Sequence, residues 1–213
     1  MLLAELHKTN EIDVKSAFSK GGYNSYYNPP SLNNPTNTRS THGGEIVAVK
    51  SHLNSMPIDN SILTRIASAS DQSLSFAASY FKMKNFTVIL CSVYLFCNEG
   101  LSIKNSNILF QLQLLKDMTG MPLIIYGDFN LNAEVLESGG WLDRLGVKVQ
   151  QIQGSSTLYN SANSHIDYFL VSNQIDVLVK NIEPVKNSPW FPHISLDLTI
   201  TCKPRSVLGL QVI

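Results

Sequence analysis

The chain has 213 residues, with 16 acidic and 16 basic side chains and a formal net charge of zero. A chain of this length can build one domain with a two-layer core, and we expect residues 1–213 to form a single domain. A neutral chain lacks the global basic field that holds extended DNA, so any attraction for phosphate must be local or supplied by a bound cation.

The composition also bears on location and on cysteine chemistry. No apolar run approaches the length that spans a bilayer, and residues 1–20 lack the charged flank and cleavage site of a signal peptide. We therefore expect a soluble, monomeric, intracellular protein of the nucleus or cytoplasm. The cysteines are odd in number and lack metal-ligand spacing, so we expect no disulfide and a buried, apolar Cys91 beside Cys97 and Cys202.

The first quarter of the chain predicts short strands and one helix. Residues 1–8 are an apolar start that ends in a carboxylate and a histidine, and residues 13–18 predict a helix that stops at a Gly-Gly pair. Residues 23–27 predict a strand whose three tyrosines suit half-buried packing better than base stacking. Asn, Ser and Pro are concentrated over residues 24–40, which predicts a loop, and residues 43–49 predict a further strand.

The middle of the chain has the most regular patterns. Residues 73–81 and 86–96 predict two strands of a hairpin. Residues 105–118 predict an amphipathic helix whose buried face holds Ile108, Leu109, Leu112 and Leu115.

The stretch over residues 123–130, an apolar run that stops at Gly127, predicts a buried strand. It ends in Gly-Asp-Phe-Asn, and a period of two puts Asp128 and Asn130 on the same side. Residues 132–138 then predict a short helix capped by Asn132, with Glu134 and Glu137 in solvent.

The last third predicts strands over residues 147–152, 157–159, 166–172, 177–182 and 194–201, with a loop over 154–164. Asp167 lies near the start of one strand, and His193 stands just before the last. Strands outnumber helices and follow short connections, which favours mostly antiparallel sheets.

The order of three segments resembles the endonuclease/exonuclease/phosphatase superfamily. These segments are Gly-Asp-Phe-Asn (127–130), Ile-Asp-Tyr-Phe (166–169) and a histidine that opens the last strand. The superfamily includes deoxyribonucleases, apurinic and retroelement endonucleases, and inositol-polyphosphate phosphatases. The resemblance extends over nearly the whole chain and implies an α/β (α+β) fold: a four-layer α-β-β-α sandwich of two mixed, mostly antiparallel sheets. The family's first strand, which ends in a metal-site Asn, has no counterpart here, so we expect an N-terminally truncated member.

The resemblance also implies a role for each candidate residue. Residues 3–7 are similar to a Leu-Gln-Glu-Thr-His segment whose Glu binds a divalent metal, which makes Glu5 the expected metal ligand. Tyr94 lies in a Ser-Val-Tyr-Leu segment similar to one whose tyrosine hydroxyl faces the scissile phosphate.

The remaining roles concern the attacking water and the phosphate. Asp128 would position or deprotonate the water, and Asn130 would donate a hydrogen bond to a phosphate oxygen. Asp167 would accept a hydrogen bond from one ring nitrogen of His193, so that the other nitrogen meets the phosphate.

Carboxylates with a single imidazole suit Mg²⁺ or Mn²⁺ rather than zinc. We therefore expect a metal-dependent phosphodiester hydrolase, an endonuclease that acts on nucleic acid, DNA rather than RNA. Two alternatives stay open. One is a catalytically weak or inactive remnant of a mobile element with a binding role, because Phe-Pro-His (191–193) replaces the family's Ser-Asp-His. The other is a phosphomonoesterase of inositol phosphates or similar small substrates.

Overall fold

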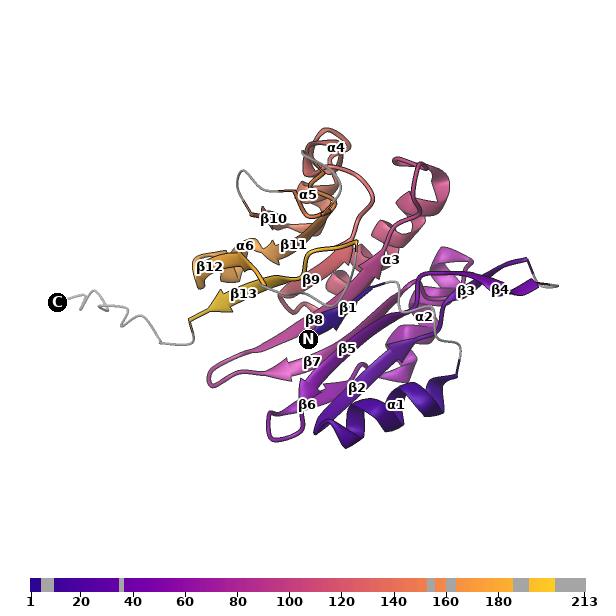
Figure 1. The fold of residues 1–213 in the computed structure, drawn as a ribbon. Helices are drawn as coiled ribbons and strands as arrows, with labels where there is room; N and C mark the ends of the chain where they lie inside the picture. Colours follow the sequence, from indigo (N-terminus) through magenta and orange to yellow (C-terminus); the bar gives the residue numbers. More distant parts are fainter. Residues whose placement is uncertain (5–9, 35–36, 153–155, 160–163, 186–191, 202–213) are drawn as a thin grey trace.

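A computed structural model describes residues 1–4, 10–34, 37–152, 156–159, 164–185 and 192–201, with backbone alone for 31–42 (Figure 1). Its largest element is a six-stranded sheet with the strand order β10-β11-β9-β8-β7-β6. The strands are β6 (Ser55–Pro57), β7 (Phe76–Lys82), β8 (Thr87–Tyr94), β9 (Leu123–Asp128), β10 (Val147–Gln150) and β11 (Asp167–Ser172). Only β8 and β9 run parallel; every other neighbouring pair in this sheet is antiparallel.

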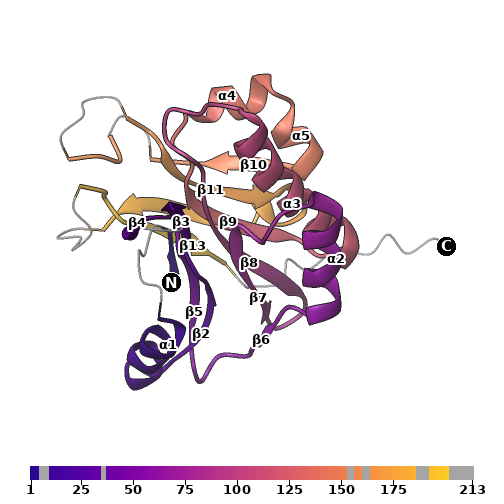
Figure 2. The same ribbon diagram turned by 90° about the vertical axis from the view of Figure 1, so that its right-hand side faces the viewer.

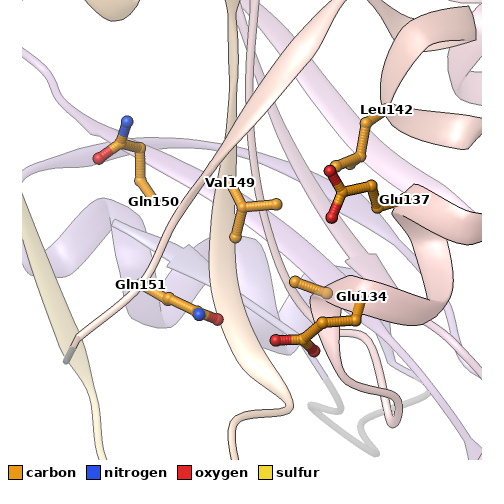
Figure 3. Close-up of a pocket in the computed structure, with 7 residues that line it drawn as sticks. Glu134, Glu137, Leu142, Val149, Gln150 and Gln151 are labelled. Carbon is orange, nitrogen blue, oxygen red and sulfur yellow. The ribbon is translucent and has the colours of Figure 1, made fainter. Parts of the chain in front are cut away.

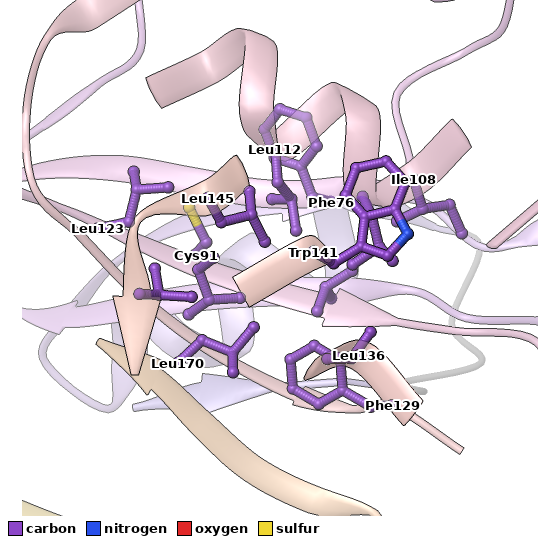
Figure 4. Packing of buried hydrophobic residues seen from close by; sticks show 14 of the residues in the cluster. Phe76, Cys91, Ile108, Leu112, Leu123, Phe129, Leu136, Trp141, Leu145 and Leu170 are labelled. Atoms are coloured by element: carbon purple, nitrogen blue, oxygen red, sulfur yellow. The ribbon is translucent and has the colours of Figure 1, made fainter. Parts of the chain in front are cut away.

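Helices cover one face of this sheet. They are α2 (Asn60–Ser70), α3 (Ile103–Thr119), α4 (Ala133–Ser138) and α5 (Trp141–Leu145). The α3 helix is the crossover that a parallel β8–β9 pair requires. Its apolar face is buried as predicted, through Ile108, Leu109, Leu112 and Leu115, and packs on outward-facing strand residues such as Cys91 and Leu123 (Figure 4).

A second β-layer covers the opposite face of the six-stranded sheet. It contains a three-stranded sheet of β1 (Leu2–Leu3), β5 (Glu45–Lys50) and β2 (Tyr23–Asn28), and a pair formed by β12 (Val179–Pro184) and β13 (Leu196–Ile200). Val47 and Val49 pack against Ala77 and Leu90 between the layers, and Leu196 and Leu198 pack against Ile124 and Phe169.

The α1 helix (Glu11–Lys20) lies against β2 on the outer side of this layer (Figures 1 and 2). The predicted α-β-β-α sandwich of mixed, mostly antiparallel sheets is therefore confirmed. Within the described residues no helix is long and apolar enough to cross a membrane.

Two segments differ from the sequence-based prediction. The loop expected over 24–40 is wrong, because β2 continues through Asn28 and a hairpin of β3 (Ser31–Asn34) and β4 (Asn37–His42) follows. Asn and Ser favour turns locally, but strand pairing needs only their backbone groups. The strand expected over 157–159 is also wrong, because this segment forms an isolated bridge between Leu158 and His193 instead of a strand.

Several smaller features of the fold were not predicted, and others agree with the prediction only in part. The helices α2, α5 and α6 (Asn173–Asp176) and strand β6 were not predicted. Asn132 stands at the N-cap of α4 as expected, yet its side chain makes no capping hydrogen bond. Cys91 is buried and Cys97 exposed, both as free thiols, whereas Cys202 lies outside the described residues.

One carboxylate lies inside the second β-layer. Glu45 is only 4% exposed. The Asn28 side-chain amide donates to its Oε2 at 2.7 Å, and the backbone N–H groups of Gly44 and Glu45 donate to the carboxylate as well. Burial raises the pKa of Glu45 to about 7, although these hydrogen bonds favour the charged form and limit the rise.

This pKa predicts a pH-dependent effect of Glu45→Gln on stability. Because the folded-state pKa lies above the ordinary value of 4.5, the ionised carboxylate costs the folded state free energy, and this cost develops as pH rises from 4.5 to about 7. We expect Glu45→Gln to raise the free energy of unfolding by at most about 3 kcal/mol near pH 8, and by much less near pH 4. Denaturant unfolding at both pH values measures the difference. Glu134→Gln, at an exposed site, should show no such dependence; an equal effect of Glu45→Gln at both pH values would contradict the prediction.

Candidate functional site

Strand register brings three of the expected residues to one edge of the six-stranded sheet. Tyr94 is the pairing partner of Asp128, and Asp128 is the partner of Asp167. Residues directly opposite each other on neighbouring strands share a face. All three therefore point from the ends of β8, β9 and β11 toward the second β-layer, where each is at most 6% exposed.

The described part of β1 ends near the same edge. Leu3 pairs with Ile46 of β5, and its carbonyl accepts a hydrogen bond of 2.6 Å from Ser92 Oγ of β8. Ser92 lies two residues before Tyr94 in β8, so both side chains face the second β-layer. The bond from Ser92 to Leu3 therefore joins the two layers beside the site. Glu5, the expected metal ligand, lies outside the described residues, and its role stays a prediction.

His193 stands over the two carboxylates. Its Nδ1 lies 2.9 Å and 3.1 Å from the two oxygens of Asp167, which are hydrogen-bond distances. Its Nε2 lies 3.9 Å from Asp128 Oδ2, which is too long for a hydrogen bond. Because a carboxylate only accepts, Nδ1 carries a hydrogen, and Nε2 is the ring nitrogen that faces Asp128.

The backbone around His193 is fixed by pairing with residues 157–159. Tyr159 N donates to Pro192 O at 3.0 Å, and Ile194 N donates to Thr157 O at 2.8 Å. The His193 side chain is still 25% exposed, so solvent or a ligand can reach the ring.

Asn130 lies in a tight turn that follows β9. Its φ of 50° is in the left-handed region, which asparagine tolerates better than most residues. Its backbone N–H donates to Asp128 Oδ1 at 3.1 Å, and its side-chain Nδ2 donates to the carbonyl of Leu95 at 2.8 Å. The amide has a second hydrogen, so the expected contact with a phosphate oxygen is compatible with this bond.

Two structural parts of the site were missed from the sequence. The Leu95 carbonyl fixes Asn130, but a backbone acceptor leaves no mark in side-chain patterns. The segment 157–159 holds His193, but its pairing partner lies more than 30 residues away in the chain. Neither could be found without the fold.

The helix-side face beneath the turn is rigidly packed. Phe129 and Tyr168 stack with their ring centroids 4.2 Å apart and an interplanar angle of 4°. Tyr168 donates a hydrogen bond of 3.2 Å to Leu131 O. Burial raises the pKa of Tyr168 and of Tyr126, and the charges of Asp128 and Asp167 raise both further. Both phenols therefore stay neutral at physiological pH.

The donor set suits a hard divalent cation. Asp128, Asp167 and His193 each offer one ligand atom, and these atoms lie within 4.8 Å of one another. Two carboxylates and an imidazole can hold Mg²⁺ or Mn²⁺. A cation bound through Nδ1 would have to displace the bond between Asp167 and this nitrogen. The arrangement therefore suits a hydrogen-bonded acid–base chain at least as well as a three-ligand metal centre.

A separate pocket of about 330 Å³ lies between α4, α5 and β10 (Figure 3). Its lining includes the exposed carboxylates Glu134 and Glu137 and the carboxamides of Gln150 and Gln151, but none of the expected site residues. Two carboxylates repel phosphate, so this pocket does not suit the substrate expected at the sheet edge.

No family model and no curated protein matches the sequence, whereas many solved structures match the fold. The endonuclease domain of TRAS1, a telomere-specific non-LTR retrotransposon, is 14% identical, with a TM-score of 0.59 over 93% of this chain and 97% of that one. The catalytic domain of Xenopus laevis APE2 is 15% identical, with a TM-score of 0.62 over 93% and 82%. The 3'-5' exonuclease NExo from Neisseria meningitidis is 16% identical, with a TM-score of 0.60 over 93% and 88%.

The packing beside Asp128 predicts the effect of Gly127→Ala. A Cβ at this position would lie 2.5 Å from Val93 O and 2.6 Å from Val93 Cγ1. Because Val93 belongs to the paired strand β8, β9 would have to move away from it. We expect Gly127→Ala to lower the free energy of unfolding by about 2 kcal/mol, measured by denaturant unfolding.

Gly22→Ala is the matched control, since a Cβ there meets nothing within 4 Å although φ is 76°. We expect Gly22→Ala to lower the free energy of unfolding by about 1 kcal/mol, which is the cost of a left-handed backbone for a residue with a Cβ. A Gly127→Ala variant as stable as the wild-type protein would show that β8 and β9 are not this close.

Proposed function

We propose that this chain, which has the fold of the endonuclease/exonuclease/phosphatase superfamily, is a divalent-metal-dependent phosphodiester hydrolase and acts as an endonuclease on DNA. The observation that carries the proposal is the chain of groups from Asp167 through His193 toward Asp128, with separations of 2.9 Å and 3.9 Å. Hydrolysis of a phosphodiester needs a positioned water, donors for the phosphate oxygens and a group that holds a proton, and these residues are of the right kinds.

Asp167 and His193 act together in the proposed mechanism. Asp167 holds the Nδ1 hydrogen, which fixes the tautomer and the orientation of the ring. The Nε2 atom then faces the phosphate, where a protonated ring donates a hydrogen bond and stabilises the negative charge that develops in the transition state. Burial of Asp167 keeps water from competing for this hydrogen bond.

Asp128 positions and deprotonates the attacking water. Its carboxylate is held by the backbone N–H of Asn130, and it lies on the Nε2 side of His193. The second amide hydrogen of Asn130 and the hydroxyl of Tyr94 donate to non-bridging phosphate oxygens.

A divalent cation, when bound, neutralises charge on the phosphate and on the leaving oxygen. Glu5, which follows β1 by two residues in the sequence, would hold it. The residue before His193 is Pro192, where the family's motif has an aspartate. Fewer fixed oxygens around the cation predict weak binding, with half-maximal activity at about millimolar Mg²⁺.

Nucleic acid is the proposed substrate because of the proteins that share the fold. One is named as a retrotransposon endonuclease domain and another as an exonuclease. NExo is also described as a 3' phosphatase bound to a product DNA hairpin, which makes a phosphomonoesterase the second candidate. A binding remnant without turnover is the third candidate, and Pro192 is the residue that favours it.

Plasmid nicking tests the proposal directly. Supercoiled plasmid is incubated with the protein in a Mg²⁺ series and with chelator, beside model phosphomonoesters. We expect nicking that requires the cation, with a loss of at least ~100-fold in Asp128→Ala and in His193→Ala, because each removes a group that positions or moves a proton.

Glu134→Gln, which changes an exposed carboxylate outside the site, is the control and should keep full activity. Cleavage of monoesters alone would select the phosphatase. Nicking that survives both Asp128→Ala and His193→Ala would remove these residues from the proposed mechanism, and no hydrolysis at any Mg²⁺ concentration would favour the remnant.

A further inference from the structure

Thr157 is buried completely in the short segment that runs beside His193, and it has no role in the mechanism above. It makes hydrogen bonds to the start of β11, which carries Asp167, and to Ile194, which directly follows His193. It therefore lies where the two halves of the hydrogen-bonded pair meet.

The Thr157 hydroxyl is saturated by hydrogen bonds to the β11 side. Its Oγ1 accepts from the backbone N–H groups of Ile166 at 3.2 Å and Asp167 at 3.3 Å. The same hydroxyl donates to Ser164 O at 3.0 Å. A hydroxyl has one hydrogen and two lone pairs, so every position is used.

The Thr157 backbone is tied to both sides. Its N–H donates to Ser164 O at 2.7 Å, and its carbonyl accepts from Ile194 N at 2.8 Å. The next residue, Leu158, forms the bridge to His193. Since Ile194 directly follows His193, a single residue connects the backbone of Asp167 to the backbone of His193.

We propose that Thr157 is a positioning residue that sets the distance between Asp167 and His193 Nδ1. Without the hydroxyl, the buried N–H of Asp167 and the partly buried N–H of Ile166 lose their acceptor, and Asp167 is free to shift relative to the imidazole. A displacement of about 1 Å in such a site is enough to cost ~100-fold in rate. The catalytic consequence rests on the proposed function, whereas the effect on the histidine does not.

A purely structural role would look different, and the chain offers a matched comparison. Ser172, the last residue of β11, is also buried, and its Oγ accepts from Leu123 N at 2.8 Å. This bond joins β11 to β9 at the end of the pair opposite to Asp128 and Asp167. Ser172→Ala therefore removes the same kind of bond, a buried hydroxyl that accepts from a backbone N–H, from the other end of β11.

The test compares Thr157→Val, Thr157→Ser and Ser172→Ala in the full chain. The readouts are thermal stability, the ¹⁵N and ¹H resonances of the His193 ring, and the rate of plasmid nicking. We expect Thr157→Val to lose or shift the Nδ1–H resonance and to lower kcat by ~10-fold to ~100-fold with KM unchanged. Thr157→Ser should restore both, and Ser172→Ala should lower stability alone.

Identical His193 resonances in Thr157→Val and Ser172→Ala would overturn the proposal. Thr157→Cys is measured if the valine variant does not fold. Its thiol is a weaker acceptor than the hydroxyl, so we expect an intermediate shift of the Nδ1–H resonance. An unchanged resonance in Thr157→Cys would overturn the proposal as well. If the wild-type protein hydrolyses nothing, the proposed function fails while the ring resonances still decide the role of Thr157.

Discussion

The site depends on the pairing of β9 with β8 on one side and with β11 on the other, in a single register. Tyr94, Asp128 and Asp167 form a row of polar side chains across the three strands. Asp128 is the middle residue of this row, with Tyr94 and Asp167 as its direct pairing partners. A shift of either partner strand by one residue would turn its side chain to the helix-covered face. Gly127 makes this pairing possible, since its α-carbon approaches Val93 more closely than any larger residue could. The polar row is thus a consequence of strand packing.

The row also places two buried carboxylates close together, and their charge must be compensated. Asp128 and Asp167 are only 5% and 3% exposed. Buried carboxylates are costly unless hydrogen bonds or a cation compensate them. Backbone N–H groups and the His193 ring supply part of this compensation. A divalent cation near the same edge would add to it, and it would also meet the need for positive charge in a chain whose net charge is zero.

Elements with strong patterns could be predicted from the sequence, whereas those defined by distant partners could not. The apolar runs of β8, β9 and β11 and the apolar face of α3 are dense enough to define their burial. The α2 helix was missed because Ser and Thr, which favour caps and turns in isolation, separate its apolar residues, and burial of Ile66 against the core decides the outcome. The candidate residues Asp128, Asp167 and His193 were identified through a resemblance in motif order. Their distances, the Leu95 contact and the role of 157–159 follow from the tertiary fold and have no local signal.

The central claim is that Asp167 and His193 act as one unit in hydrolysis, and a kinetic double-mutant cycle tests it most directly. The cycle measures kcat for Asp167→Asn, His193→Ala and the double variant at saturating Mg²⁺. Residues that act as a unit have non-additive effects, so the double variant should be no slower than His193→Ala alone. If the two single losses multiply in the double variant, Asp167 and His193 contribute independently, and the arrangement at the sheet edge does not work as described.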